Sequence, residues 1–425
     1  MKEELLHYIW KFQLFKSHHF IDDKGDEIRV IKPGIYNKNE GPDFLQAHIL
    51  IGEMNFFGSV EIHLKSSDWN KHKHQHNDHY KQVILHVVYK IDAPIFIDYI
   101  KLPRQLEVEK YIAKEIIENT NLLETSKSFI PCQNFFDKER STKFHDIFWV
   151  ERLAIERYEF RVEELKQRLT YMNDWPQLFC CLLFSAFGAK VNKEAFTMLG
   201  QYCSHKILFR EAKDLHTIEA FLFGMAGFLC TSPKDTYHQK LRTTFKYLMH
   251  KHKLAQPPKI LWKFSRMRPS SFPSIKIAQL AHLIFLLKGK IFSLTDDEQI
   301  EIWIKNKINF KASNYWQTHT NFGNKAKKIP VNAGKRLKDN ILLNAILPFH
   351  FFYNKSLGKF SIENYTTWLG KISPEKNSIT SAFENLGLIF ASALETQAVL
   401  HLHKKYCTFK RCYSCHWGQK LLCDK

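Results

Sequence analysis

The chain has 425 residues, of which 44% are hydrophobic and 14% aromatic. This length exceeds the size at which a single core stops growing, so we expect two or three domains, and so much apolar surface excludes extensive disorder. The 62 Lys and Arg against 43 Asp and Glu leave a formal net charge of +19, which indicates a polyanionic partner.

The positive charge is concentrated in one quarter of the chain. Residues 240–340 hold 21 Lys and Arg against 5 Asp and Glu. We expect nucleic acid as the partner, because basic side chains that neutralise phosphates release bound counterions. Two other interpretations stay open, a lysine-rich surface without a specific role and attraction to an anionic membrane surface.

Targeting and redox features predict a cytoplasmic protein that does not enter a membrane. The N-terminal residues are acidic early and lack a long apolar core, unlike a secretory signal. The longest strongly apolar stretch, residues 277–287, is too short to cross a bilayer. Several of the nine cysteines have apolar neighbours, which indicates reduced thiols rather than a disulfide framework.

Residues 1–135 predict an α/β domain. A short helix is expected over residues 3–15, and a further helical region over 105–135. Alternating polar and apolar residues predict strands between them, and residues 52–55 suggest a hairpin turn. The expected strands cover residues 28–31, 46–51, 56–64 and 83–91.

Residues 146–400 predict a basic, mostly helical domain, followed by a cysteine-containing tail over 401–425. Prolines separate the helical patterns, and the glycines near residue 224 indicate close helix packing. The expected helices cover residues 149–169, 175–187, 193–202, 217–229, 236–250, 275–287 and 298–305. The fold class is therefore α+β, with an N-terminal mixed β-sheet and flanking helices before the helical domain.

Two acidic residues mark the expected hairpin. Asp43 precedes one strand and Glu61 lies in the next, so the hairpin would bring both carboxylates to one end. A divalent cation, Mg²⁺ or Mn²⁺, relieves the repulsion between such carboxylates. The period of two places His63 and Lys65 on the face that carries Glu61, where either could orient a metal-bound water.

This arrangement resembles the PD-(D/E)XK nuclease superfamily. In that superfamily a Pro-Asp dipeptide begins one strand and Glu-x-Lys occupies the next. Pro42-Asp43 and Glu61-Ile62-His63 match this pattern in order and spacing. The resemblance implies a restriction-endonuclease-like fold and metal-dependent cleavage of nucleic acid.

One position departs from the superfamily pattern and one is undecided. His63 stands where the pattern has Lys, and Lys65 could serve in its place. Histidine ligates metals or acts as a base near neutral pH, so the exchange is compatible with activity. The superfamily also uses an acidic residue on its first helix, for which Glu3 and Glu4 are equal candidates.

A histidine-rich segment follows the acidic strand. One interpretation makes these residues transition-metal ligands, and a second makes them groups that contact phosphates and donate a proton beside a carboxylate-bound metal. Some members of the nuclease superfamily carry histidines here, so the resemblance favours the second role for His72 and His74. A plain polar loop is the third interpretation. The segment contains His72, His74, His76, Asp78 and His79.

The whole chain also resembles a large bacterial family defined only as a domain of unknown function. The shared sequence motifs include the segment ending in Gly-Pro-Asp-Phe at residue 44, the strand 58–63, the Ser-Asp-Trp of residues 67–69 and the strand 83–88. This resemblance covers nearly all 425 residues and implies no activity.

Two further features lie in the second half. Lys263, Arg266 and Arg268 alternate with aromatic residues, which suits a surface that pairs with phosphates and stacks on bases, although helix capping or ion pairing would explain them equally. In the tail, three cysteines have a spacing typical of a structural Zn²⁺ or iron–sulfur site, against simple packing of small thiols. These are Cys407, Cys412 and Cys415.

The sequence thus favours a metal-dependent phosphodiesterase that acts on nucleic acid. The basic helical domain would bind the nucleic acid. A non-catalytic nucleic-acid-binding or scaffold protein with a degenerate nuclease fold is the first alternative, and protein partners are unknown. The second alternative is a zinc hydrolase, which would require three residues of the histidine segment and its neighbouring strand to converge. The candidates are His63, His72, His74, His76 and Asp78.

Overall fold

The computed structural model describes residues 1–95, 103–135, 147–256, 259–305 and 308–423. The chain forms two compact units. The first consists of residues Met1–His145, Ser381–Leu388 and Leu402–Lys425, and the second of Asp146–Thr380 and Ile389–His401. The cysteine-containing tail therefore belongs to the first unit, together with the N-terminal residues.

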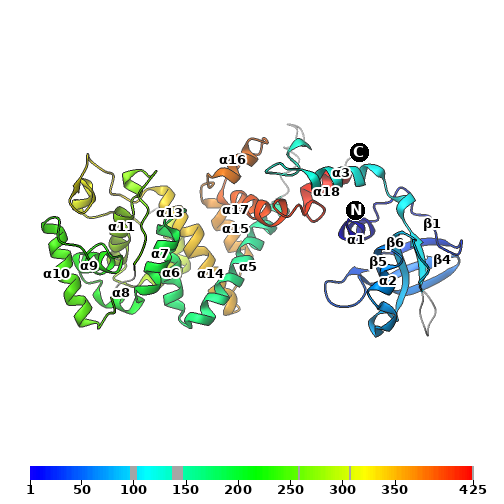
Figure 1. Cartoon of the computed structure of the whole chain (residues 1–425), viewed down its shortest axis with the longest axis horizontal. Helices are drawn as coiled ribbons and strands as arrows, with labels where there is room; N and C mark the ends of the chain where they lie inside the picture. Colours follow the sequence, from blue (N-terminus) through cyan, green and yellow to red (C-terminus); the bar gives the residue numbers. More distant parts are fainter. Residues whose placement is uncertain (96–102, 136–146, 257–258, 306–307, 424–425) are drawn as a thin grey trace. The chain divides into compact units, whose positions relative to one another are not determined.

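The first unit contains a mixed seven-stranded sheet in the order β1-β2-β4-β5-β6-β7, with β3 paired to β4 (Figure 1). Strands β1 to β5 pair antiparallel, whereas β5 with β6 and β6 with β7 pair parallel. The strands are β1 (Phe20–Ile21), β2 (Glu27–Lys32), β3 (Ile35–Tyr36), β4 (Phe44–Ile51), β5 (Met54–Lys65), β6 (Val83–Lys90) and β7 (Arg104–Glu107).

The β4–β5 hairpin forms as the sequence predicts, because Gly52 takes a positive φ of 58° at its turn. Helix α1 (Glu3–Phe12) packs against β5 through its buried apolar residues. Gly58 lets β6 approach β5 closely, since a Cβ there would lie 2.5 Å from Cγ2 of Ile84. The hairpin and its parallel neighbour thus form a rigid frame for the polar residues of β5.

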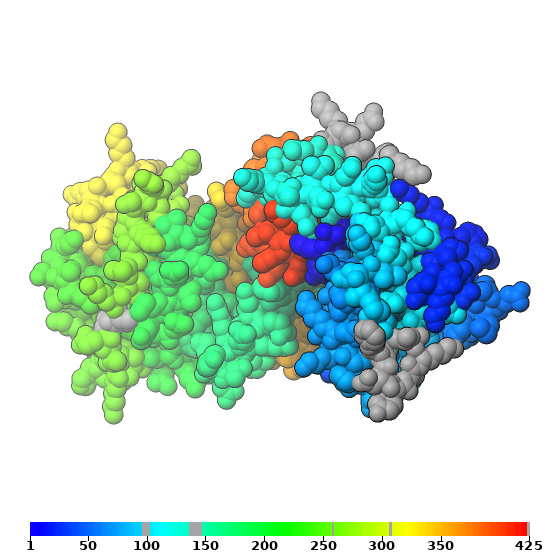
Figure 2. All heavy atoms as spheres, turned by 45° about the vertical axis from the view of Figure 1, so that its right-hand side comes forward, coloured from blue at the N-terminus to red at the C-terminus, as the bar shows by residue number. Residues whose placement is uncertain are grey.

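The expected helical region over residues 105–135 is wrong in its first part. Residues Arg104–Glu107 form strand β7, and the helix α3 is confined to Lys114–Thr125. The C-terminal helix α18 (His416–Cys423) packs against α3, and Figure 2 shows the red tail against cyan residues and the dark blue N-terminus. The N-terminal helix and the C-terminal helix therefore both belong to the first unit.

The second unit is mostly helical, which confirms the α+β class of the chain. Its core is apolar and rich in phenylalanine. None of the described helices is long and apolar enough to span a membrane. Its helices are α5 (Ile147–Met172), α6 (Trp175–Phe187), α7 (Lys193–Tyr202), α8 (His205–Glu211), α9 (Leu215–Met225), α10 (Thr236–Lys251), α11 (Pro273–Leu286), α12 (Asp297–Ile304), α13 (Lys335–Ile341), α14 (Leu347–Ser356), α15 (Ile362–Lys371) and α17 (Ala393–Leu402). Most of α16 (Ser378–Glu384) belongs to the first unit.

A buried acid in this unit gives a pH-dependent stability. Burial chiefly raises the pKa of Glu219 from 4.5 to about 7, although Tyr237 donates a hydrogen bond to its Oε2 (2.6 Å). The folded state then binds the extra proton between these values, so stability falls as pH rises from about 4.5 to 7. Glu219→Gln should remove this loss, which amounts to at most about 3 kcal/mol at pH 8. Urea unfolding at pH 5 and pH 8 measures it, with exposed Glu194→Gln as the control, and an unchanged pH slope would contradict it.

Candidate metal centre

Asp43 and Glu61 lie side by side where strands β4 and β5 meet. The backbone N–H of Asp43 donates to Glu61 Oε2 (3.1 Å), and the N–H of Ile62 donates to Asp43 Oδ2 (3.0 Å). Each carboxylate is therefore held by the backbone of the opposite strand. The structure brings together the two acidic residues on which the sequence-based hypothesis depends.

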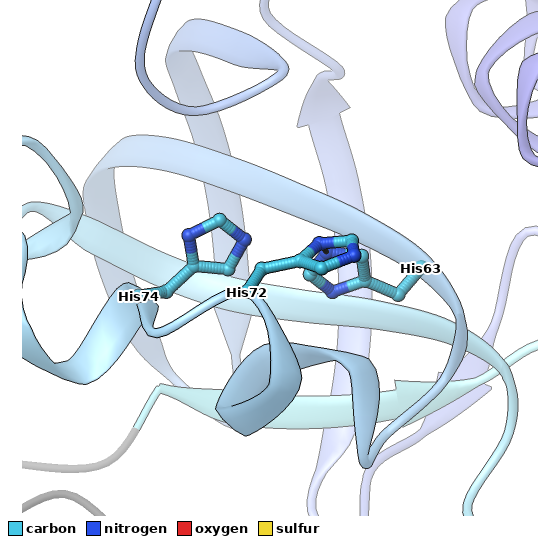
Figure 3. A group of neighbouring side chains, drawn as sticks. All are labelled: His63, His72 and His74. Atoms are coloured by element: carbon cyan, nitrogen blue, oxygen red, sulfur yellow. Dashed lines mark hydrogen bonds between the residues drawn. The ribbon is translucent and has the colours of Figure 1, made fainter.

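The second oxygen of Glu61 faces imidazole rings. Glu61 Oε1 lies 3.3 Å from His74 Nε2 and 3.5 Å from His63 Nε2. His72 Nδ1 lies 3.2 Å from His63 Nε2. One ring nitrogen from each histidine falls within 4.8 Å of the other two, and Figure 3 shows the rings turned toward one another. We call Glu61, His63, His72 and His74 the histidine–glutamate cluster.

The histidine–glutamate cluster is partly closed to solvent. Glu61 is 4% exposed and His63 2%, whereas His72 is exposed. Burial and the negative charge of Asp43 raise the pKa of Glu61 to about 9. Burial and the neighbouring imidazoles lower the pKa of His63 to about 2. Without a cation the cluster thus holds a neutral acid and a neutral imidazole, and the neutral form is the one in which histidine binds metals.

A second layer of side chains fixes the rings of the cluster. His63 Nδ1 lies 2.9 Å from Nε2 of the fully buried His86, so a proton between them orients the His63 ring. His74 stacks on Tyr80 with ring centroids 3.8 Å apart, and Trp69 meets it edge to face. His74 Nε2 is buried without a hydrogen bond, which is costly unless a ligand occupies that position.

Helix α1 supplies polar residues on the Asp43 side. His7 Nε2 lies 3.3 Å from Asp43 Oδ2, and although burial opposes charging of His7, the attraction of Asp43 raises its pKa. Burial raises the pKa of Glu3, which interacts electrostatically with Asp43 and His72. Glu4 instead accepts a hydrogen bond from Tyr413. Of the two candidates, Glu3 is thus the one whose pKa responds to Asp43 and His72, whereas Glu4 is engaged by Tyr413.

The sequence is recognised as a member of a known group. A family model with the description "Protein of unknown function (DUF2851)" matches residues 3–378. The chain belongs to the DUF2851 family. No curated protein sequence matches it, and no solved structure does.

Some predicted site residues of this DUF2851 chain lie outside the histidine–glutamate cluster. Lys65 is exposed at the end of β5, and its backbone N–H bonds to Asp68 Oδ2. His76 is exposed, and Asp78 pairs with Lys81 at 2.6 Å. The convergence required by the zinc hypothesis is therefore met by three histidines, without His76 and Asp78.

The basic segment of the second unit is exposed, but its aromatic residues are not arranged for base stacking. Lys263, Arg266 and Arg268 face solvent. Trp262 Nε1 donates to the Ala226 carbonyl, and its ring packs edge to face on a buried Phe. The alternation of rings and cations thus reflects an anchored segment whose charged side chains point outward.

The donor set of the histidine–glutamate cluster determines which metals it suits. Imidazole nitrogens and one carboxylate favour Zn²⁺, Mn²⁺ or another transition metal, whereas Mg²⁺ prefers oxygen ligands. Asp43, with its side chain 22% exposed, stands beside Glu61. His7 and His86 were missed by sequence reasoning, since single histidines in a helix and in a buried strand carry no distinguishing pattern.

Proposed function

We propose that this DUF2851 protein is a metal-dependent phosphodiesterase that acts on nucleic acid. The observation that carries the proposal is the approach of Glu61 Oε1 to within 3.3 Å and 3.5 Å of two imidazole nitrogens, with a third beside them. Such a donor set suits Mn²⁺ or Zn²⁺ better than Mg²⁺. Glu61, His63, His72 and His74 would hold the ion.

A bound divalent ion lowers the pKa of water and polarises a phosphoryl oxygen. Asp43, beside Glu61 and partly exposed, would accept the proton of the attacking water. His7 has a raised pKa, so it would hold a proton to give to the leaving oxygen. The chain thus offers a base and an acid next to each other, with His7 Nε2 3.3 Å from Asp43 Oδ2, beside the residues that would hold the ion.

Two features support nucleic acid as the substrate. The net charge of +19 favours a polyanion, and exposed Lys65, Lys71 and Lys73 surround the histidine segment. The order of a helix, an antiparallel hairpin and a parallel strand is compatible with the restriction-endonuclease-like fold implied by Pro42-Asp43 and the β5 motif. The resemblance in fold and motif is our reason for proposing phosphodiester cleavage, and the positive charge is our reason for proposing nucleic acid as the substrate.

Cleavage assays test this proposal. Single- and double-stranded DNA and RNA would be incubated with metal-stripped protein and added Mg²⁺, Mn²⁺ or Zn²⁺. We expect cleavage with Mn²⁺ or Zn²⁺ that is lost in Glu61→Gln and kept in Glu53→Gln, a matched change at the exposed hairpin turn. Cleavage that survives Glu61→Gln would reject the assigned site, and binding without cleavage would indicate the non-catalytic alternative.

A zinc hydrolase of small substrates is the second candidate, favoured by the convergence of three imidazoles. Hydrolysis of a small chromogenic phosphodiester separates the two functions. If nucleic acid is the substrate, added DNA or RNA inhibits this hydrolysis competitively. If small molecules are the substrates, the polymers have no effect.

A further inference from the structure

A second group of potential ligands lies in the first unit, away from the histidine–glutamate cluster. Three of its members are the tail cysteines Cys407, Cys412 and Cys415, and the fourth is Cys132, in the turn that follows α3. All four are free thiols, and Cys132 and Cys415 are buried. Sequence spacing could not indicate Cys132, because it is far from the tail along the chain.

Several contacts bring the tail to the segment around Cys132. His403 Nε2 lies 3.1 Å from the Phe129 carbonyl oxygen, and the two rings stack with centroids 4.2 Å apart. Lys410 Nζ donates to the Glu124 carbonyl. Helix α18 packs against α3, and the turn Cys412–Ser414 also contacts α3. The tail and the end of α3 are therefore joined on both sides of the cysteines.

The cysteines of the tail are held in a tight backbone turn. The N–H of Cys415 donates to the Cys412 carbonyl at 3.1 Å. At Gly418 a Cβ would lie 2.1 Å from that same carbonyl oxygen, so only glycine fits. Burial raises the pKa of the Cys415 thiol, and the backbone N–H groups of Gly418 and Trp417 oppose this rise by donating to its sulfur. Amide donors of this kind favour the thiolate, which is the form that binds metals.

The four sulfur atoms are close enough to repel one another when charged. Burial raises the pKa of Cys132, and the charges of Cys415 and Cys412 raise it further. Burial, followed by Cys415, Cys132 and Cys412, raises the pKa of Cys407 in the same way. Cations would relieve this repulsion, whereas thiols that merely fill a core need no amide donors.

The spacing of the sulfur atoms distinguishes between metals. Four thiolates around one Zn²⁺ lie about 3.8 Å apart, given a Zn–S bond of about 2.3 Å. Among the residues that the structure describes, no three of these sulfur atoms lie within 4.8 Å of one another. A cluster of several irons spreads its thiolate ligands further apart than a single ion does. We propose that Cys132, Cys407, Cys412 and Cys415 hold an iron–sulfur cluster that fastens the tail to the end of α3.

Metal analysis of the whole protein, produced and purified without oxygen, tests this inference. We expect iron and acid-labile sulfide with a broad visible absorption in the wild type. Iron and sulfide should be lost in Cys132→Ser and kept in Cys230→Ser, a matched change at an exposed thiol of the second unit. Circular dichroism of each variant shows whether it is folded.

The wild-type measurement keeps the inference falsifiable even if Cys132→Ser does not fold. Wild-type protein that contains zinc without iron, or no metal, would overturn the cluster. A folded Cys132→Ser variant that keeps its iron would overturn the assignment of the fourth ligand. Neither result bears on the histidine–glutamate cluster, so the two sites are tested separately.

Discussion

His74→Ala is expected to weaken Mn²⁺ binding by at least about 100-fold, because second-layer changes alone cost 10–100-fold and this change removes a proposed ligand. His74 Nε2 is buried without a hydrogen bond and lies 3.3 Å from Glu61 Oε1. Titration calorimetry on metal-stripped protein measures the affinity. Mn²⁺ is the appropriate probe, because thiolates select softer metals and the tail cysteines will therefore compete weakly.

Two further variants serve as a control and as a test of an indirect role. His76→Ala, two residues along and exposed, should leave Mn²⁺ affinity unchanged. His86→Ala should weaken binding by about 10–100-fold, since His86 only orients His63. Equal affinity in the wild type and in His74→Ala would show that the three rings do not bind a metal together.

Trp69→Ala should lower the free energy of unfolding by about 3–5 kcal/mol, which is the usual cost of removing a large buried ring. Trp69 is 2% exposed and forms a small core with Val83 and Ile95, against which Tyr80 packs. Its ring also meets those of His74 and His86. The variant should therefore lose both stability and metal affinity.

Urea unfolding of the metal-free protein measures the stability change. Phe57 lies in β5 and is 72% exposed. Phe57→Ala removes a comparable ring there and should lower the free energy of unfolding by well under about 1 kcal/mol. If Trp69→Ala is as mild as this control, the core beneath the histidine segment does not support it. A stability loss without any change in metal affinity would show that the rings are positioned by other contacts.

Sequence patterns predict the regular elements of this fold well and its short elements poorly. Alternation in β5 places Glu61 and His63 opposite Val60 and Ile62, and the helices α6 and α7 match their expected bounds. Strands β1 and β3 have two residues each, which is too few for any periodicity. Strand β7 was predicted as helix because its pairing with β6 is a tertiary effect.

The candidate site follows the same division. Asp43 and Glu61 could be predicted as neighbours, since one hairpin carries both. The choice of Glu3 over Glu4 depends on how α1 is rotated against the sheet, which a sequence does not specify. Cys132 could not be found, because only the folded chain brings it to the tail.

The return of residues 402–423 to the first unit has a consequence for biosynthesis. The ribosome releases the sheet and α1 long before it makes the helix that packs on α3. Until then the apolar surface of α3 lacks its cover, and the second unit, continuous except for one short excursion, can fold in the interval. In nascent chains halted before residue 402, proteases should consequently cleave the N-terminal part readily. This part should resist proteolysis only once the last helix has emerged from the ribosome.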